Sequence, residues 1–425
     1  MLAREKAYTI RQQSVQAYLL PQQRETQRLE ILLNAFVICL PIQLETGIDL
    51  RFAPSDLFLA IFLLLGLRKL VFRATVFSLW HFLLPAIFGL ATFLSVIYNG
   101  NLTRYVLLNK DIGLLVLFAT YVALTSVIDS EAKWVRLLRL FVINVSIHNM
   151  LAIAVYLSGI ELPGINELGV RISGMLHDPN AFGGLLVAAF AIHIVTYCQN
   201  RPLIAGRWGL FTLFTLPIGI LLTFSRSAWI GLVIVLLMLI GYRLYYALHP
   251  TVALAFTFAA ILVIRGTAFI SEMMVLASRP EQILVRLEIL QDALTMFQQY
   301  PLFGAGLGSY LQVYGIIIHN TPTWFLTEFG LVGFVVFTGF LLWFLRRGID
   351  AYRSSDQAGR PLLYGLIMAH LSMIGLSLGI EALYQRHWWL IMAGLATVAA
   401  VKAPLDSRVR ESGIILQFDK GEERT

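Results

Sequence analysis

The sequence predicts an all-α fold, a polytopic membrane bundle of about twelve transmembrane helices with one large extracytoplasmic loop that contains an amphipathic helix. Hydrophobic residues make up 58% of the 425 residues and charged residues 13%, whereas soluble domains contain about 45–50% and about 25%. The mean hydropathy is +0.75. Runs such as LFLAIFLLLGL and WIGLVIVLLMLIG are continuously apolar, so they lack the alternation of membrane β-barrel strands.

Each membrane-spanning helix needs about 20 predominantly apolar residues. Suitable runs lie near residues 30–46, 54–70, 76–98, 104–127, 134–157, 180–198, 206–223, 227–247, 249–264, 322–345, 361–380 and 384–402. The chain therefore divides into a cytoplasmic N-terminal segment, a first set of nine spans, an extracytoplasmic loop, three further spans and a cytoplasmic tail, at residues 1–28, 29–264, 265–321, 322–402 and 403–425.

Lysine and arginine positions predict the orientation, because short cytoplasmic loops retain these residues. With the N-terminus inside, the cytoplasmic loops hold Arg68, Lys69, Arg73, Lys133, Arg136, Arg139, Arg201, Arg207, Arg243, Arg346, Arg347, Arg353 and Arg360. Both termini are then cytoplasmic. The net charge of +7 follows from this topology and from contact with anionic membrane lipid, and it does not indicate nucleic-acid binding.

Several common features are missing from the sequence. The first 28 residues are polar and lack the apolar core of a secretory signal. Cys39 and Cys198 are predicted at different depths, which argues against a disulfide. The chain has no P-loop, CxxC pair, dinucleotide fingerprint or internal repeat, so a soluble catalytic domain is not expected.

The long outer loop is predicted to contain a helix on the membrane surface. An apolar stripe recurs there at helical spacing, formed by Ile283, Leu287, Leu290, Leu294 and Phe297. Arg286 lies at the flank of this stripe, where its guanidinium could reach along the headgroup plane into a cleft. On periodicity alone, a snorkelling arginine is the favoured interpretation of this position.

The end of the loop combines flexible backbone with a histidine. In PLFGAGLGSY, Pro301 ends the surface helix and three glycines permit tight turns or a close approach to another surface. In the following HNTPTWF, Thr321 can cap the next span and Pro322 suits its first turn. His319 is therefore held at the outer surface, where a neutral imidazole could accept a proton near neutral pH. An interfacial histidine at a helix end explains the position equally well.

Three further polar residues are candidates for the outer face. Glu328 lies inside the predicted span, where a carboxylate is either functional or paired, and Gly330 and Gly333 would permit close helix packing. Arg226 lies in LTFSRSAW between two spans joined by almost no loop, so the cation falls on the outer side. Arg171 lies in RISGMLHDPNAFGG, in which Asp178 to Asn180 predict a turn and a helix cap.

Outward arginines with a histidine and no nucleotide-binding fold favour one kind of chemistry. Outside the cytoplasm, a glycan to be transferred must arrive on a lipid carrier through a phosphate or diphosphate link. Arginine binds such oxygens bidentately and can stabilise the leaving group without a metal. A nearby histidine can deprotonate an acceptor hydroxyl.

These segments resemble the O-antigen ligase and O-antigen polymerase family of bacterial membrane glycosyltransferases. The matching stretches are RISGMLHDPNAFGG, LTFSRSAW, RLEILQDALTMFQQYPLFGAGLGSY and HNTPTWFLTEFGLVGF, in the family's order. The resemblance implies inverting, metal- and cofactor-independent transfer of an undecaprenyl-diphosphate-linked glycan to a lipid A core sugar or another glycan, at the periplasmic face of the bacterial inner membrane. It places diphosphate binding on Arg226 and Arg286 and catalysis on His319, with Arg171, Arg279 and Glu328 as additional candidates.

Other functions stay open at this point. A ligase and a polymerase share the donor and differ in the acceptor, and the compact His319 segment with a single large loop favours a ligase. A small-anion transporter, of bicarbonate for example, would also use outward arginines and buried polar residues such as Lys110 and Asp111, which could otherwise be a neutralising pair. The sequence shows no duplicated halves, which argues against transport. His177 and Asp178 alone do not define a metal site.

Overall fold

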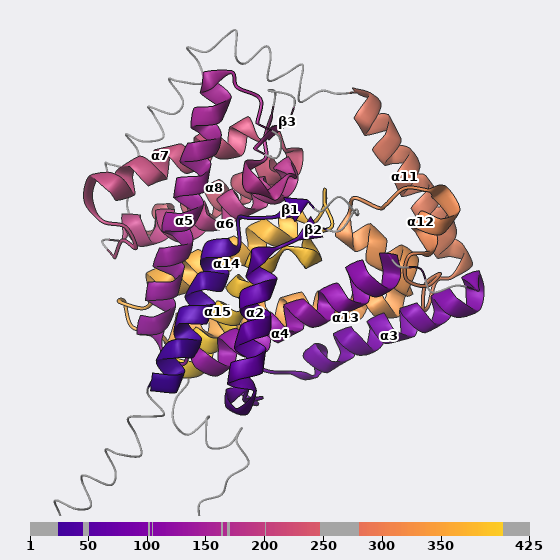
Figure 1. The fold of residues 1–425 in the computed structure, drawn as a ribbon, viewed down its shortest axis with the longest axis horizontal. Helices are drawn as coiled ribbons and strands as arrows, with labels where there is room; N and C mark the ends of the chain where they lie inside the picture. The colour runs from indigo at the N-terminus through magenta and orange to yellow at the C-terminus, as the bar shows by residue number, and fades with distance from the viewer. Residues whose placement is uncertain are drawn as a thin grey trace, which may run out of the picture.

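The computed structural model describes residues 24–45, 51–100, 103, 105–162, 165–167, 171–199, 201–246 and 280–402. It is an all-α structure with two short hairpins, β1–β2 (Leu44–Glu45 and Arg51–Phe52) and β3–β4 (Asn166–Glu167 and Arg171–Ile172). A helix over 24–39 is followed by α2 (Pro54–Gly66), α3 (Leu79–Asn99), α4 (Gly113–Val127), α5 (Glu131–Ser158), α6 (Pro179–Cys198), α7 (Gly206–Leu222) and α8 (Arg226–Tyr246). The rest comprises α11 (Pro280–Gln299), α12 (Ser309–Tyr314), α13 (Thr321–Ser354), α14 (Arg360–Leu376) and α15 (Arg386–Lys402) (Figure 1).

The helices confirm a membrane protein but not the predicted number of spans. Every predicted span that falls on described residues coincides with a helix. Within the described part of the chain, five helices are long and apolar enough to cross a membrane, and three shorter apolar helices accompany them. The run 249–264, the chain termini and Arg279 lie outside the described residues.

Helix α6 forms the centre of the bundle. It is apolar on all sides, and nearly all of its side chains are buried, which is expected of a helix surrounded by other helices. Small residues allow its neighbours to approach closely: a Cβ added at Gly365 of α14 would lie 3.1 Å from the Cα of Ile192, and one added at Gly183 would collide with Ala228 of α8.

Helix α13 is broken at Gly330, whereas the sequence predicted a continuous span. Gly330 has φ +68° and ψ −169°, which only glycine adopts readily. The glycine-rich loop that precedes α12 inserts at this break. The freed amides of Leu331 and Val332 donate to the carbonyls of Pro301 and Leu302 at 2.9 and 3.1 Å.

The carbonyls on the other side of the break are also paired. Those of Thr327 and Glu328 accept hydrogen bonds from the amides of Ala305 and Gly306, at 3.0 and 3.1 Å. A helix break at membrane depth is tolerated only where its backbone groups are paired inside the protein. The inserted loop supplies these partners, so hydrogen bonds to the loop stabilise the break in α13.

Several of the basic segments predicted to be cytoplasmic meet at one end of the bundle. Lys69 and Lys133 form ion pairs with Glu25 and Glu30 of the first helix, at 3.4 and 2.9 Å. Arg347 of α13 donates to the carbonyl of Thr75, 2.8 Å away. These contacts gather loops from separate parts of the chain on one side of the structure.

Candidate functional site

One cavity of about 250 Å³ brings together three of the predicted site residues. Arg226 begins α8, Arg286 lies on α11, and His319 immediately precedes the cap of α13. The cavity is lined by Arg226, Arg286, Leu287, Ile289, Leu290, Ile318, His319, Asn320, Thr323 and Leu378. It therefore combines cationic groups with apolar walls and contains no acidic residue among its described lining.

A tight turn between α7 and α8 places Arg226. Phe224 has φ +47°, an uncommon conformation for a bulky residue, and its buried ring holds this turn in the bundle. The hydroxyl of Ser225 accepts a hydrogen bond from the amide of Ala228, which caps α8. Arg226 is thus the first residue of a helix, and the positive end of the helix dipole adds to its own charge.

Arg171 supports this turn but does not line the cavity. Its Nε donates to the carbonyl of Thr223 at 2.9 Å, and its guanidinium also lies 3.5 Å from the side-chain oxygen of Asn180. Asn180 in turn accepts a 2.8 Å hydrogen bond from Ser225. The predicted cap at the start of α6 is confirmed, because Asp178 accepts from the amide of Asn180 at 2.9 Å.

Helix α11 presents Arg286 between two different apolar faces. Ile289, Ala293 and Met296 are buried against the rest of the protein, whereas Leu287 and Leu294 of the predicted stripe are 54% and 43% exposed. The stripe is therefore available to lipid, and a second apolar face, which the sequence analysis missed, attaches the helix to α13.

His319 is held by hydrogen bonds of the two residues that follow it. Thr321 is not the cap: Asn320 caps α13 by accepting from the amide of Thr323 at 2.9 Å. Instead, the hydroxyl of Thr321 donates to the carbonyl of Ile380 and accepts from the amide of Ala382. The Asn320 amide group also donates to a carbonyl of the same segment, that of Leu378.

Burial and nearby positive charge lower the pKa of Arg286 and that of His319. The pKa of Arg286 is lowered by burial first and then by the charge of Arg226, and the guanidinium stays protonated at neutral pH. The pKa of His319 is lowered by burial and by Arg286. Three other charges act on His319: Glu381 and Asp178 oppose this lowering, and Lys110 adds to it.

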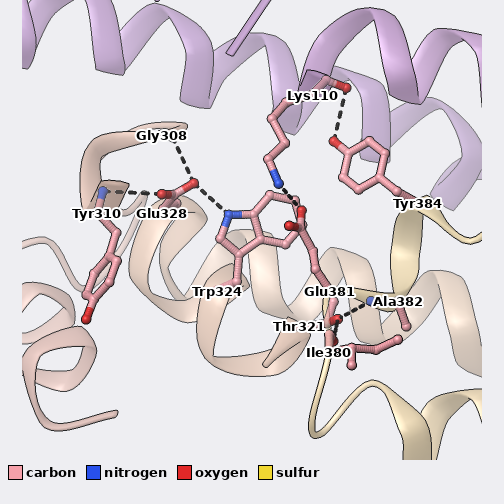
Figure 2. A network of polar contacts seen from close by, with 10 residues as sticks. All are labelled: Lys110, Gly308, Tyr310, Thr321, Trp324, Glu328, Ile380, Glu381, Ala382 and Tyr384. Carbon is pink, nitrogen blue, oxygen red and sulfur yellow. Dashed lines mark hydrogen bonds and ion pairs between the residues drawn. The ribbon is translucent and has the colours of Figure 1, made fainter. Parts of the chain in front are cut away.

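Glu328 lies outside this cavity, at the centre of a buried network (Figure 2). One of its oxygens accepts from the amide of Gly308 at 2.8 Å and from the indole of Trp324 at 2.6 Å. The other accepts from the amide of Tyr310 at 3.3 Å. Glu328 therefore fastens the glycine-rich loop to α13.

An ion pair between Lys110 and Glu381 adjoins Glu328 in the same network. The Lys110 ammonium also lies 4.5 Å from the centre of the Trp324 ring and 5.0 Å from that of Tyr384. The predicted pair of Lys110 with Asp111 is wrong, because Asp111 instead accepts from the hydroxyl of Thr92 at 2.9 Å. Lys110 and Asp111 diverge because neighbours in sequence lie on different sides of the helical segment Tyr105–Ile112 that precedes α4.

Sequence reasoning missed Glu381, Asn320, Thr323 and Leu378. Each lies in a short connection or at a helix start, and only tertiary contacts bring the 377–382 segment to His319. Among the residues that the structure describes, no group of three or more His, Cys, Asp or Glu side chains is placed to hold a metal ion.

This geometry defines a class of protein: a helical membrane protein whose cavity combines cationic side chains with apolar walls. The family model described as O-Antigen ligase matches residues 211–338, a segment that contains Arg226, Arg286 and His319. The match confirms the resemblance to the O-antigen ligase and polymerase family for this part of the chain and indicates a glycosyltransferase type of activity. It gives no support to a bicarbonate transporter. No curated protein matches the chain.

Proposed function

We propose that the protein is an O-antigen ligase-type glycosyltransferase at the periplasmic face of the bacterial inner membrane. Its donor is an undecaprenyl-diphosphate-linked glycan, and its acceptor is a sugar hydroxyl of the lipid A core or a related glycan. The observation that carries this proposal is the shared cavity of Arg226, Arg286 and His319. A polymerase with the same donor is the closest alternative.

The cavity has the chemistry that a lipid-linked diphosphate requires. Arg226 and Arg286 would bind the diphosphate oxygens through charge-assisted, bidentate hydrogen bonds. Apolar side chains of Leu287, Leu290 and Leu378 in the same wall suit the first part of the polyprenyl chain. The exposed stripe of α11 continues this apolar surface.

In the proposed reaction, the acceptor oxygen attacks the anomeric carbon of the donor sugar with inversion. A bond forms between that oxygen and carbon, and the bond from the carbon to the diphosphate oxygen breaks. His319 takes the acceptor proton, and the lowered pKa keeps its imidazole neutral for this purpose. The two arginines stabilise the negative charge that develops on the leaving diphosphate.

The fold supports the orientation in this proposal. The ion pairs of Lys69 and Lys133 and the contact of Arg347 lie at the end predicted to be cytoplasmic. The cavity is formed by the opposite set of connections, between α7 and α8 and before α13. By the charge rule for membrane loops, this arrangement supports a cavity that opens on the outer side.

Two experiments test the proposal. Purified protein should transfer glycan from a defined undecaprenyl-diphosphate donor, also in the presence of a chelator. Deletion of the gene should leave full-length glycan chains on the lipid carrier if the protein is a ligase, and single repeat units if it is a polymerase. Failure of transfer, with anion flux through liposomes instead, would contradict the enzymatic function.

A further inference from the structure

One buried hydroxyl connects the Glu328 network to the helix that carries Arg286. The side chain of Tyr310 is 1% exposed, and its hydroxyl donates a 3.2 Å hydrogen bond to the carbonyl of Ile289 in α11. Ile289 lies three positions after Arg286, so the bond acts within one turn of the arginine. It is a contact between the inserted loop and the surface helix.

The Tyr310 hydroxyl is suited to act only as a donor towards this carbonyl. Burial and nearby Asp292 and Tyr314 raise the pKa of Tyr310 to about 12, so the phenol keeps its proton throughout the physiological pH range. Its backbone is fixed as well, because the amide of Tyr310 donates to Glu328 (Figure 2). The donor therefore projects from a rigid position.

The rest of the attachment of α11 is mainly apolar. Ile289, Ala293 and Met296 supply its buried face, and hydrophobic contact has little directional preference. Thr327 of α13 adds a longer contact of 3.3 Å to the Ala293 carbonyl, but its single proton is shared with the Thr323 carbonyl at 2.8 Å. Among the contacts that the structure describes, Tyr310 thus supplies the strongest directional bond between α11 and its support.

A directional bond matters here because Arg226 and Arg286 repel each other across the cavity. A slip of α11 by one residue would turn Arg286 by about 100° around the helix axis and remove it from the cavity wall. We propose that Tyr310 is a positioning residue, whose hydroxyl holds α11 in the register that keeps Arg286 opposite Arg226. This inference rests on the proposed function of the two arginines.

The test compares Tyr310→Phe with the matched control Tyr314→Phe, whose ring stacks on Tyr310 at 4.6 Å. Spin labels would be attached to cysteines introduced at Glu288 on α11 and Val335 on α13, after the native Cys39 and Cys198 are replaced by residues that the label does not modify. The proposal predicts a broadened or shifted distance distribution for Tyr310→Phe and an unchanged one for the control. An unchanged distribution in both variants overturns it.

Kinetics separate positioning from a general structural effect. Tyr310→Phe should raise the donor KM by about tenfold, from a hydrogen bond and the displaced arginine, and should also lower kcat, because Arg286 stabilises the leaving diphosphate in the proposed reaction. The acidic limb of kcat/KM should move to higher pH, because a displaced Arg286 no longer depresses the pKa of His319. Loss of kcat at unchanged KM and pH profile overturns the proposal. If wild-type protein transfers no glycan, the proposed function fails, and the spin-label distances still decide the role of Tyr310 in placing α11.

Discussion

Arg226 and Arg286 line the same cavity, although they belong to α8 and α11. The charge of Arg226 helps to lower the pKa of Arg286, so the two guanidiniums repel each other across the cavity. A bound diphosphate would replace this repulsion with attraction. The two cationic side chains are therefore already positioned to bind an anion, as in preorganised cationic sites.

Arginine geometry, and not charge alone, should determine donor affinity. Arg226→Lys and Arg286→Lys keep the charge but lose the planar fork, and each should raise the donor KM by about tenfold or more, since a hydrogen bond to a charged group contributes about 1.5–3 kcal/mol. Arg346→Lys is the control, because Arg346 lies on the exposed surface of α13. The measurement is the initial transfer rate at varied donor concentration.

The pH dependence of transfer should report the lowered pKa of His319. A neutral imidazole is required, so kcat/KM should stay high below pH 6.5, the ordinary midpoint of histidine, and fall only at more acidic pH. Arg286→Gln removes the largest charge contribution to this lowering, whereas burial and Lys110 remain, so its acidic limb should move to higher pH. An acidic limb above pH 6.5 in the wild-type enzyme would contradict the assignment of His319 as the base.

Removing only one partner of the ion pair between Lys110 and Glu381 should destabilise the protein more than replacing both partners with apolar residues. Lys110→Met leaves a partly buried carboxylate without its cation, and the free energy of unfolding should fall by about 3–5 kcal/mol. The double variant Lys110→Met with Glu381→Leu should recover most of this loss. Thermal denaturation in detergent measures both, and equal destabilisation of the two variants would show that the pair itself is not the cause.

Glycine is required where the inserted loop contacts α13. Gly304 has φ +77°, and an added Cβ would lie 2.3 Å from the backbone carbon of Glu328, so Gly304→Ala should lower the melting temperature and abolish transfer. Gly89→Ala is the matched control, because a Cβ there meets no atom within 4 Å and alanine favours a helix by about 0.5–1 kcal/mol. Equal behaviour of the two variants would contradict the inserted-loop arrangement.

The sequence predicted the helices well because apolar runs and charged loops are local signals. It also placed Arg226, Arg286 and His319 on separate segments near one face, and the structure brings these residues to one cavity. The roles of Arg226, Arg286, His319, Arg171 and Glu328 remain predictions. Arg279 lies outside the described residues.

Tertiary contacts explain what the sequence could not predict. Threonine is a common helix cap, but Asn320 caps α13 because the Thr321 hydroxyl forms hydrogen bonds with Ile380 and Ala382. The break in α13 depends on partners from the 301–306 loop, and no local pattern around Gly330 reveals them. Lys110 finds Glu381 only because the helical segment Tyr105–Ile112 packs beside the segment before α15.

Binding of undecaprenyl diphosphate to the His319→Ala protein tests the central claim most directly, because turnover no longer obscures affinity. We expect this variant to bind the lipid with the affinity of the wild type. Adding Arg226→Ala or Arg286→Ala should then weaken binding by more than about tenfold, with the fold intact by thermal denaturation. Unchanged affinity after removal of both arginines would show that the cavity does not hold the diphosphate.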